Sequence, residues 1–199
     1  MSQTIDFIFD FGSPNAYLAY RALPGVVERS GATLNMVPCL LGGIFKATGN
    51  QSPVQAYAGV KGKLDYFRLE IQRFVEKHEL RNFSFNPNFP VNTLTMMRGA
   101  IVAEMDGRLA DYVEVGMTHM WEQGLKMDDP EVFASAMTKA GFDGLAMLER
   151  MQDPMVKAKL VNHTAGAVDR GAFGIPTFYV GDEMYFGKDR LEEVEAAAS

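Results

Sequence analysis

The segment 4–11 restricts the fold of this chain more than any other part of the sequence. Its apolar side chains alternate along the segment, at Ile5, Phe7, Phe9 and Phe11. This period of two predicts a largely buried β-strand. Ser13-Pro14 follows, and it is a standard helix start because serine caps the first turn and proline suits the first helical position.

The next residues continue the same unit. Apolar positions at helical spacing predict a helix from Pro14 to about Arg29, and Gly31 ends it. Thr33–Val37 reads as a second strand that stops at Pro38. Strand, helix and strand within this length are typical of a βαβ unit with a parallel pair.

The end of the chain predicts two further strands. Pro176–Val180 is rich in β-formers, Gly181-Asp182 is a turn, and Glu183–Phe186 supplies the partner of a hairpin. A last helix is expected from Arg190, with Asp189 as its N-cap.

The region between these two units is predicted to be mostly helical. It begins with a glycine-rich segment at 41–51 and continues with helical periodicity. The expected helices cover 64–75, Leu94–Met105, Leu109–Trp121, a start at Pro130, the region near Asp143, and 154–170. This order of strands and helices along the chain predicts an α/β thioredoxin-like (βαβ-ββα) fold with a large helical insertion. Residues 1–41 and 171–199 would form the discontinuous thioredoxin-like domain, and 42–170 the helical insertion domain.

Charge and composition exclude several classes of function. Nineteen basic and 25 acidic residues give a net charge of −6, which argues against nucleic-acid partners because these require phosphate neutralisation. No apolar run approaches the roughly 20 residues that cross a bilayer. The N-terminus also lacks a secretory pattern, so we expect a cytoplasmic protein without a membrane partner.

The sulfur- and metal-binding residues narrow the chemistry further. The single cysteine, Cys39, excludes an internal disulfide and a CxxC redox pair. His78, His119 and His163 show no metal-ligand spacing and are expected at the surface or its boundary, so no metal site is predicted. Ten of the 13 methionines lie between Met96 and Met155. They are interpreted as helix–helix core, with an adaptable ligand surface as the alternative.

Ser13 is the residue whose local chemistry is most suggestive. A side chain at a helix N-terminus faces unpaired backbone amides and the positive end of the macrodipole, which favour negative charge. In thioredoxins such a position holds cysteine thiolates, but residues 13–16 contain no sulfur. The Ser13 hydroxyl could hydrogen-bond a thiolate brought by a cofactor, or Ser13 could serve only as an N-cap.

Several motifs together carry a resemblance that extends over essentially the whole chain. They are the segments 9–19, 41–46, 49–50, 171–178 and 187–191. In combination they resemble the 2-hydroxychromene-2-carboxylate isomerase family, a DsbA-like branch of the thioredoxin superfamily that is related to kappa-class glutathione transferases. The resemblance implies glutathione as cofactor, Ser13 as the catalytic group, and a homodimer. Asn15 stands where relatives often carry an aromatic or small residue, which implies a different pocket mouth.

The resemblance also implies which residues line the site. Those implied for glutathione are Asn50, Ile175, Pro176, Phe186, Gly187, Lys188 and Asp189. Those implied for a small aromatic carboxylate substrate are Lys46, Pro53 and Asn88. Each has a plainer alternative: Lys46 as a solvated lysine, Asp189 as only a helix cap, and Pro176 as a simple turn proline rather than a cis-proline opposite the first helix.

The function expected from this resemblance is isomerisation. A glutathione-dependent enzyme would interconvert 2-hydroxychromene-2-carboxylate and trans-o-hydroxybenzylidenepyruvate in aromatic degradation, by reversible thiolate addition to a conjugated C=C bond. Two alternatives remain open. One is a kappa-like glutathione transferase or peroxidase with the same cofactor site. The other is a non-catalytic DsbA-like domain that binds a partner.

Overall fold

A mixed four-stranded sheet lies at one end of the molecule, in a computed structural model that describes residues 3–199. The sheet order is β2-β1-β3-β4; β1 runs parallel to β2 and antiparallel to β3, and β3 pairs with β4 as a hairpin. The strands are β1 (Thr4–Phe9), β2 (Thr33–Pro38), β3 (Thr177–Val180) and β4 (Glu183–Phe186). Chain segments from both ends therefore build one sheet, as the thioredoxin-like order predicts.

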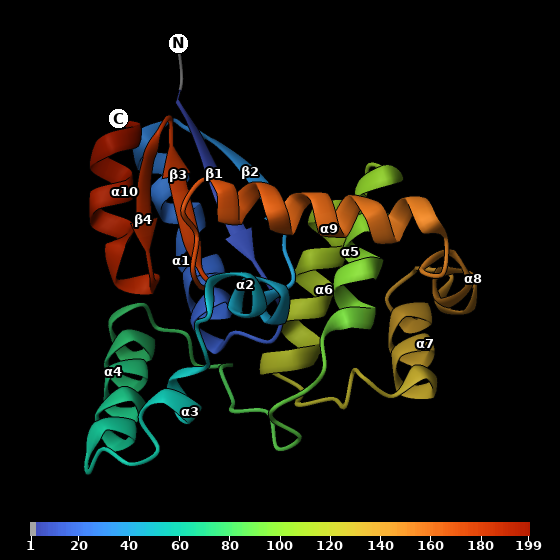
Figure 1. Cartoon of the computed structure of the whole chain (residues 1–199), viewed down its shortest axis with the longest axis horizontal. Coiled ribbons are helices and arrows are strands. Elements are labelled where there is room, and N and C mark those ends of the chain that lie inside the picture. The colour runs from blue at the N-terminus through green and yellow to red at the C-terminus, as the bar shows by residue number, and fades with distance from the viewer. Residues whose placement is uncertain (1–2) are drawn as a thin grey trace.

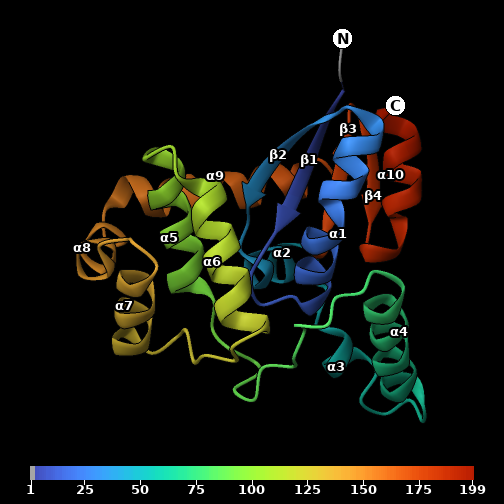
Figure 2. The ribbon, with the colours of Figure 1, turned by 180° about the vertical axis from the view of Figure 1, so that it is seen from behind.

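Helices cover both faces of this sheet. Figures 1 and 2 show α1 (Pro14–Ser30) and α10 (Leu191–Ala198) together on one face, and α9 (Pro154–Asp169) crossing the opposite face. Helix α1 ends as the sequence predicts, because Gly31 takes a positive φ of 65° and donates its N–H to the carbonyl of Val27 at 2.9 Å.

The insertion contains the remaining helices of the described chain. They are α2 (Leu41–Thr48), α3 (Pro53–Ala56), α4 (Lys63–Lys77), α5 (Leu94–Met105), α6 (Leu109–Trp121), α7 (Pro130–Lys139) and α8 (Gly144–Arg150). The helices predicted from periodicity are confirmed, and α9 begins at Pro154, where the Asp153 carboxylate accepts the N–H of Met155 at 2.8 Å. The domain boundaries proposed from sequence stay a prediction. Within residues 3–199, no helix combines the length and apolarity needed to cross a membrane.

Helix α2 is the main departure from the predicted elements, because its glycines suggested only a glycine-rich segment. It forms by packing against α9. A side chain at Gly43 would place its Cβ 3.0 Å from the γ-methyl of Thr164, so glycine permits a close approach of the two helices. Tertiary contact overrides a poor helix propensity here.

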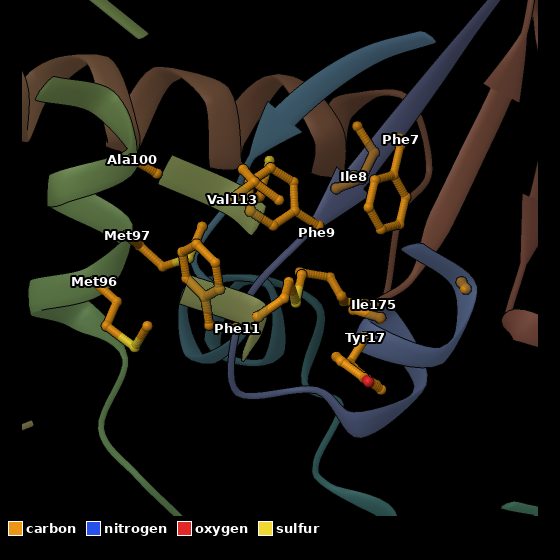
Figure 3. Close-up of a cluster of buried hydrophobic side chains, with 14 of the residues drawn as sticks. Phe7, Ile8, Phe9, Phe11, Tyr17, Met96, Met97, Ala100, Val113 and Ile175 are labelled. Atoms are coloured by element: carbon orange, nitrogen blue, oxygen red, sulfur yellow. The ribbon is translucent and has the colours of Figure 1, made fainter. Parts of the chain in front are cut away.

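One hydrophobic core joins the sheet to the insertion. The aromatic rings of Phe178, Phe7, Phe9, Phe11 and Tyr112 follow one another at centroid distances of 5.3 to 5.8 Å, from β3 through β1 to α6. Figure 3 shows Phe9 and Phe11 beside apolar side chains of the insertion, including Met97 and Val113. These contacts fix the end of β1 against the helical insertion.

The methionine-rich region belongs to this core, as predicted. Eight of its ten methionines are buried, and the other two, Met105 and Met155, are exposed. The expectation for His119 was wrong, because this residue is only 9% exposed. Its burial lowers the pKa of the imidazole.

Candidate active site

The candidate site is built on residues 10–13, here named the Ser13 turn, which connect β1 to α1. The backbone N–H of Ser13 donates to the carbonyl of Asp10 at 3.2 Å, and the N–H of Gly12 donates to Asp10 Oδ1 at 2.8 Å. The indole Nε1–H of Trp121 donates to the carbonyl of Phe11 at 2.8 Å. The buried side chain of Trp121 therefore holds the turn in place.

Ser13 occupies the N-cap of α1, as predicted. Its φ and ψ of −99° and 114° are extended, Pro14 takes the first helical position, and Oγ accepts the N–H of Ala16 at 3.2 Å. Ser13 is 5% exposed. The hydroxyl also donates to the carbonyl of Ile175 at 3.1 Å, across a sequence separation of 162 residues. The serine is therefore more than a local cap.

The Ile175-Pro176 bond is cis, as the resemblance implied, and it faces the Ser13 turn. Pro176 is followed directly by β3, and its carbonyl accepts the N–H of Gly187 at 2.9 Å. Gly187 is thereby fixed beside the start of the hairpin. Hydrogen bonds and chain continuity thus join four residues into one neighbourhood, namely Ser13, Ile175, Pro176 and Gly187.

Asn50 and Phe186 border this neighbourhood. The Asn50 side chain donates from Nδ2 to the carbonyl of Phe173 at 2.7 Å, so the end of α2 is joined to the segment that precedes Ile175. The Phe173 and Phe186 rings lie 4.5 Å apart between centroids, and both are partly exposed. Direct binding of glutathione by either residue stays a prediction.

Lys188 and Asp189 are placed differently from one another. The Lys188 side chain is 4% exposed, with Nζ 4.8 Å from the Phe74 ring centre and 2.5 Å from Asp189 Oδ1. The Asp189 side chain is 60% exposed. The prediction that Asp189 caps the last helix was wrong: a 3-10 turn covers Lys188–Arg190, and Arg190 is the N-cap position of α10. The N-cap position of α10 has no side-chain cap bond.

The three residues implied for the substrate lie on separate elements. Lys46 is exposed near the end of α2, and Pro53 is the first residue of α3, which Ser52 caps. The Asn88 amide donates to Asn86 Oδ1 at 3.2 Å and to the Gly124 carbonyl at 3.0 Å. Asn88 therefore supports its own loop. Their contact with a substrate stays a prediction.

The electrostatics of the site centre on Asp10, which is completely buried. Burial raises the pKa of its carboxyl, while hydrogen bonds from Thr93, Gly12 and Leu41 act in the opposite direction. Burial, followed by the charge of Asp10, raises the pKa of the Cys39 thiol to about 12. Cys39 is therefore protonated at neutral pH and cannot supply a thiolate. Among residues 3–199, no group of three or more His, Cys, Asp and Glu could hold a metal ion.

Comparison with known proteins assigns the family. A model described as a DSBA-like thioredoxin domain matches residues 4–198. The 2-hydroxychromene-2-carboxylate isomerase of Pseudomonas putida is 31% identical over 193 residues, which cover 97% of this chain and 93% of that protein. The chain belongs to this isomerase family. Its relatives support isomerisation as the class of activity.

Other relatives agree with this assignment. A solved selenomethionine 2-hydroxychromene-2-carboxylate isomerase is 30% identical, with a TM-score of 0.84 over 98% of this chain and 93% of that one. Glutathione S-transferase kappa 1 of Rattus norvegicus is 28% identical over 203 residues, covering 96% of this chain and 88% of that protein. A probable DsbA oxidoreductase of Streptomyces coelicolor, 16% identical with a TM-score of 0.71, shares the fold.

Sequence reasoning did not identify the residues that support the Ser13 turn from behind rather than facing a ligand. Asp10 and Thr93 received no role, although Thr93 Oγ1 donates to Asp10 Oδ1 at 2.6 Å. A signal was present in the sequence, because Asp10 is an acidic residue between Phe9 and Phe11 at the end of a buried strand. Buried acids need hydrogen-bond partners, but those partners come from distant segments that no local pattern identifies.

Proposed function

We propose that this protein is a glutathione-dependent isomerase that interconverts 2-hydroxychromene-2-carboxylate and trans-o-hydroxybenzylidenepyruvate. The observation that carries the proposal is the Ser13 hydroxyl at the N-terminus of α1, hydrogen-bonded to the Ile175 carbonyl. This arrangement offers a thiolate a hydroxyl donor and the positive end of a helix. The substrate comes from the names of the relatives in Pseudomonas and Sphingobium.

The residues present fit a thiol tripeptide. The first turn of α1 contains no acidic side chain that would repel a thiolate. Asn15 Oδ1 is a buried side-chain oxygen with no hydrogen-bond partner in the described chain, so an acceptor remains beside Ser13. The exposed carboxylate of Asp189 suits an ammonium group such as that of a γ-glutamyl residue.

Bound glutathione would supply a thiolate that adds reversibly to a conjugated C=C bond, which becomes single, rotates and is restored. Ser13 would turn its hydroxyl from the Ile175 carbonyl to the sulfur and hold it in the ionised form. The Ile175 carbonyl would then be free to accept an N–H of the bound peptide. Backbone pairing of this kind gives affinity without side-chain contacts.

Lys46 would serve the substrate end of the site. Its exposed ammonium group on α2 suits the carboxylate of an aromatic substrate. The neighbouring turn of α3, which starts at Pro53, and the loop around Asn88 would form further walls. We also propose that the protein forms a homodimer, because its resemblance to the isomerase family implies one. Analytical ultracentrifugation would test this proposal by measuring the mass in solution.

Two measurements on the parent protein test the function. Calorimetry should show saturable binding of glutathione, and conversion of 2-hydroxychromene-2-carboxylate should require glutathione. S-methylglutathione, which has no free thiol, is the matched control and should bind without supporting conversion. Conversion at an equal rate without any thiol would contradict the mechanism, and absence of glutathione binding would favour the partner-binding alternative.

A kappa-like transferase is the second candidate, because glutathione S-transferase kappa 1 proteins are also relatives. It would use the same glutathione site and differ in the substrate pocket. Parallel assays with chlorodinitrobenzene and with hydroxychromene carboxylate separate the two. Glutathione conjugation to the first, without conversion of the second, would replace the isomerase proposal with the transferase.

A further inference from the structure

Asp10 makes a set of hydrogen bonds that links three separate parts of the site. Its Oδ1 accepts the N–H of Gly12 at 2.8 Å and the hydroxyl of Thr93 at 2.6 Å. Its Oδ2 accepts the N–H of Leu41, the first residue of α2, at 2.8 Å. One buried carboxylate therefore contacts the Ser13 turn, the start of α2 and the start of α5.

Neither of the two helix starts that Asp10 contacts has a side-chain cap from its own N-cap residue, although Asn92 Oδ1 accepts the N–H of Leu94 at the start of α5. Leu40 is the N-cap position of α2 and provides no side-chain cap. Thr93 is the N-cap residue of α5, yet its hydroxyl forms no cap and donates to Asp10 instead. Threonine commonly caps helices, so the loss of that local bond indicates a role for the bond to Asp10.

Packing around Gly12 adds a steric restriction to these hydrogen bonds. A Cβ at Gly12 would lie 3.3 Å from the γ-methyl of Thr93 and 3.4 Å from Asp10 Oδ1. The turn therefore has little room to move between the strand end and α5. Because Ser13 follows Gly12 directly, this limited space also restricts where Ser13 can lie.

The Asp10 carboxylate can accept all three of these hydrogen bonds, whereas the side-chain amide of an asparagine could not. Three donors converge on two oxygens, whereas an asparagine would direct an NH₂ group at one of the donors. The burial that raises the pKa of Asp10 makes its charge unfavourable for stability. Retaining an acid here is therefore better explained by what it positions than by the stability it provides.

We propose that Asp10 is a positioning residue for the isomerase site. Its carboxylate holds the Ser13 turn against α2 and α5, and so sets the place of the Ser13 hydroxyl relative to the helix that carries Lys46 and leads to Asn50. The expected effect of Asp10 on turnover rests on the proposed function. The expected restraint of the Gly12 amide by Asp10 is independent of that function.

The experiment compares three variants with a matched control. Thr93→Val keeps the γ-methyl contact with Gly12 and removes the hydroxyl, whereas Thr93→Ser keeps the hydroxyl and removes the methyl. Asp10→Asn removes the charge. Thr164→Val is the control, because Thr164 is equally buried and its Oγ1 accepts the N–H of Leu40 at 3.0 Å, but it does not bond to Asp10.

The first readout is hydrogen exchange at the Gly12 amide, which requires neither glutathione nor activity. Thr93→Val and Asp10→Asn should exchange this amide about tenfold faster or more, because a bond to a charged acceptor has been weakened or removed. Thr93→Ser and Thr164→Val should leave it unchanged. The second readout is turnover, where Thr93→Val should lower kcat about tenfold and Thr93→Ser should restore it.

The outcomes separate this proposal from the proposed function. Unchanged exchange at Gly12 in both Thr93→Val and Asp10→Asn would overturn the positioning role. Faster exchange with full kcat would overturn its catalytic consequence. If the parent protein shows no glutathione-dependent conversion, the proposed function fails, and the exchange result alone decides whether Asp10 positions the turn.

Discussion

Two Ser-Pro pairs in this chain start helices, but only Ser13 of the first pair is proposed to act on the reacting thiol, whereas the second pair starts the turn proposed as a substrate wall. Ser13 caps α1 by accepting the N–H of Ala16 at 3.2 Å, and Ser52 caps α3 by accepting the N–H of Gln55 at 3.3 Å. Both have an extended backbone, and both precede a proline at the first helical position. At the level of local structure the two serines are equivalent.

Their tertiary surroundings differ. The Ser13 hydroxyl donates to a backbone carbonyl 162 residues away, whereas the Ser52 hydroxyl donates to the side chain of Gln55 in its own turn. Helix α1 has 17 residues and α3 has four, so the macrodipole behind Ser13 is far better developed. A helix cap thus becomes a candidate reactive position only when distant segments complete it.

The largest expected difference between the two serines is in turnover. Ser13→Ala should lower kcat at pH 7 by about 10²–10³, the usual loss when one donor to a developing anion is removed. Ser52→Ala should change kcat little. Each substitution removes one cap and should lower the free energy of unfolding by about 1 kcal/mol, which urea titration would check.

The pH dependence sharpens this prediction. The Ser13→Ala defect should shrink at high pH, where glutathione ionises without assistance. Equal losses of turnover in the two alanine variants, or no loss in either, would remove the functional distinction between the serines.

The next effect is on the acidity of a thiol placed at each cap. Ser13→Cys should have a pKa below the reference of about 8.5, because the amides and dipole of α1 favour its thiolate. Ser52→Cys should stay close to that reference. Iodoacetamide labelling at a series of pH values would measure both. Native Cys39 should not interfere, because burial raises its pKa to about 12.

The Ser13→Cys thiol should also form a mixed disulfide with oxidised glutathione more readily than Cys39 does in the parent protein. The variant should not be an efficient isomerase, because its own sulfur would occupy the place of the cofactor thiol. Equal pKa values for the two introduced cysteines would mean that the N-terminus of α1 is electrostatically ordinary.

A smaller effect is expected from Trp121, which contacts the Ser13 turn and has no counterpart at Ser52. Trp121→Phe removes the donor to the Phe11 carbonyl, now at 2.8 Å, and leaves that buried acceptor unpaired. The free energy of unfolding should fall by about 1–3 kcal/mol. The effect that is smaller is the one on turnover, which should fall less than in Ser13→Ala because the Ser13 side chain remains. A larger loss than in Ser13→Ala would show that the indole matters more than the hydroxyl.

The smallest effect concerns the pH dependence of stability. Folding raises the pKa of Asp10 above its ordinary 3.8, so the folded chain holds this proton more tightly than the unfolded chain does. The contribution of Asp10 to stability should therefore fall as pH rises from 3.8 through the folded pKa. Asp10→Asn should flatten this part of the curve in urea unfolding at a series of pH values. An unchanged slope would contradict a raised pKa.

Sequence alone predicted the parts of the fold that depend on local patterns. Alternation in 4–11, the Ser13 cap and the Gly31 stop are features of neighbouring residues, and all three are confirmed. The cis bond before Pro176 came from family resemblance and is also confirmed. Helix α2 was missed, because its glycines are poor helix formers and its stability comes from packing on α9.

The candidate site was less predictable because its geometry depends on contacts between distant residues. Asp189 matched a capping pattern, yet a 3-10 turn displaced the start of α10 by one position. The resemblance implied Lys188 for glutathione, and the structure shows its side chain buried against Phe74. Asp10 was visible as an acid in an apolar segment, but its partners Leu41 and Thr93 lie 31 and 83 residues away.

The sheet topology has a consequence for how the protein is synthesised. Strand β1 pairs with β2 on one side and with β3 on the other, and β3 begins only at Thr177. During translation the edge of β1 that faces β3 therefore stays unpaired until residues 177–180 have left the ribosome, and an unpaired edge can join other strands. Ser13 leaves the ribosome 162 residues before Ile175, whose carbonyl accepts the hydrogen bond of its hydroxyl. A chain that ends before Ile175 therefore lacks the carbonyl to which the Ser13 hydroxyl donates.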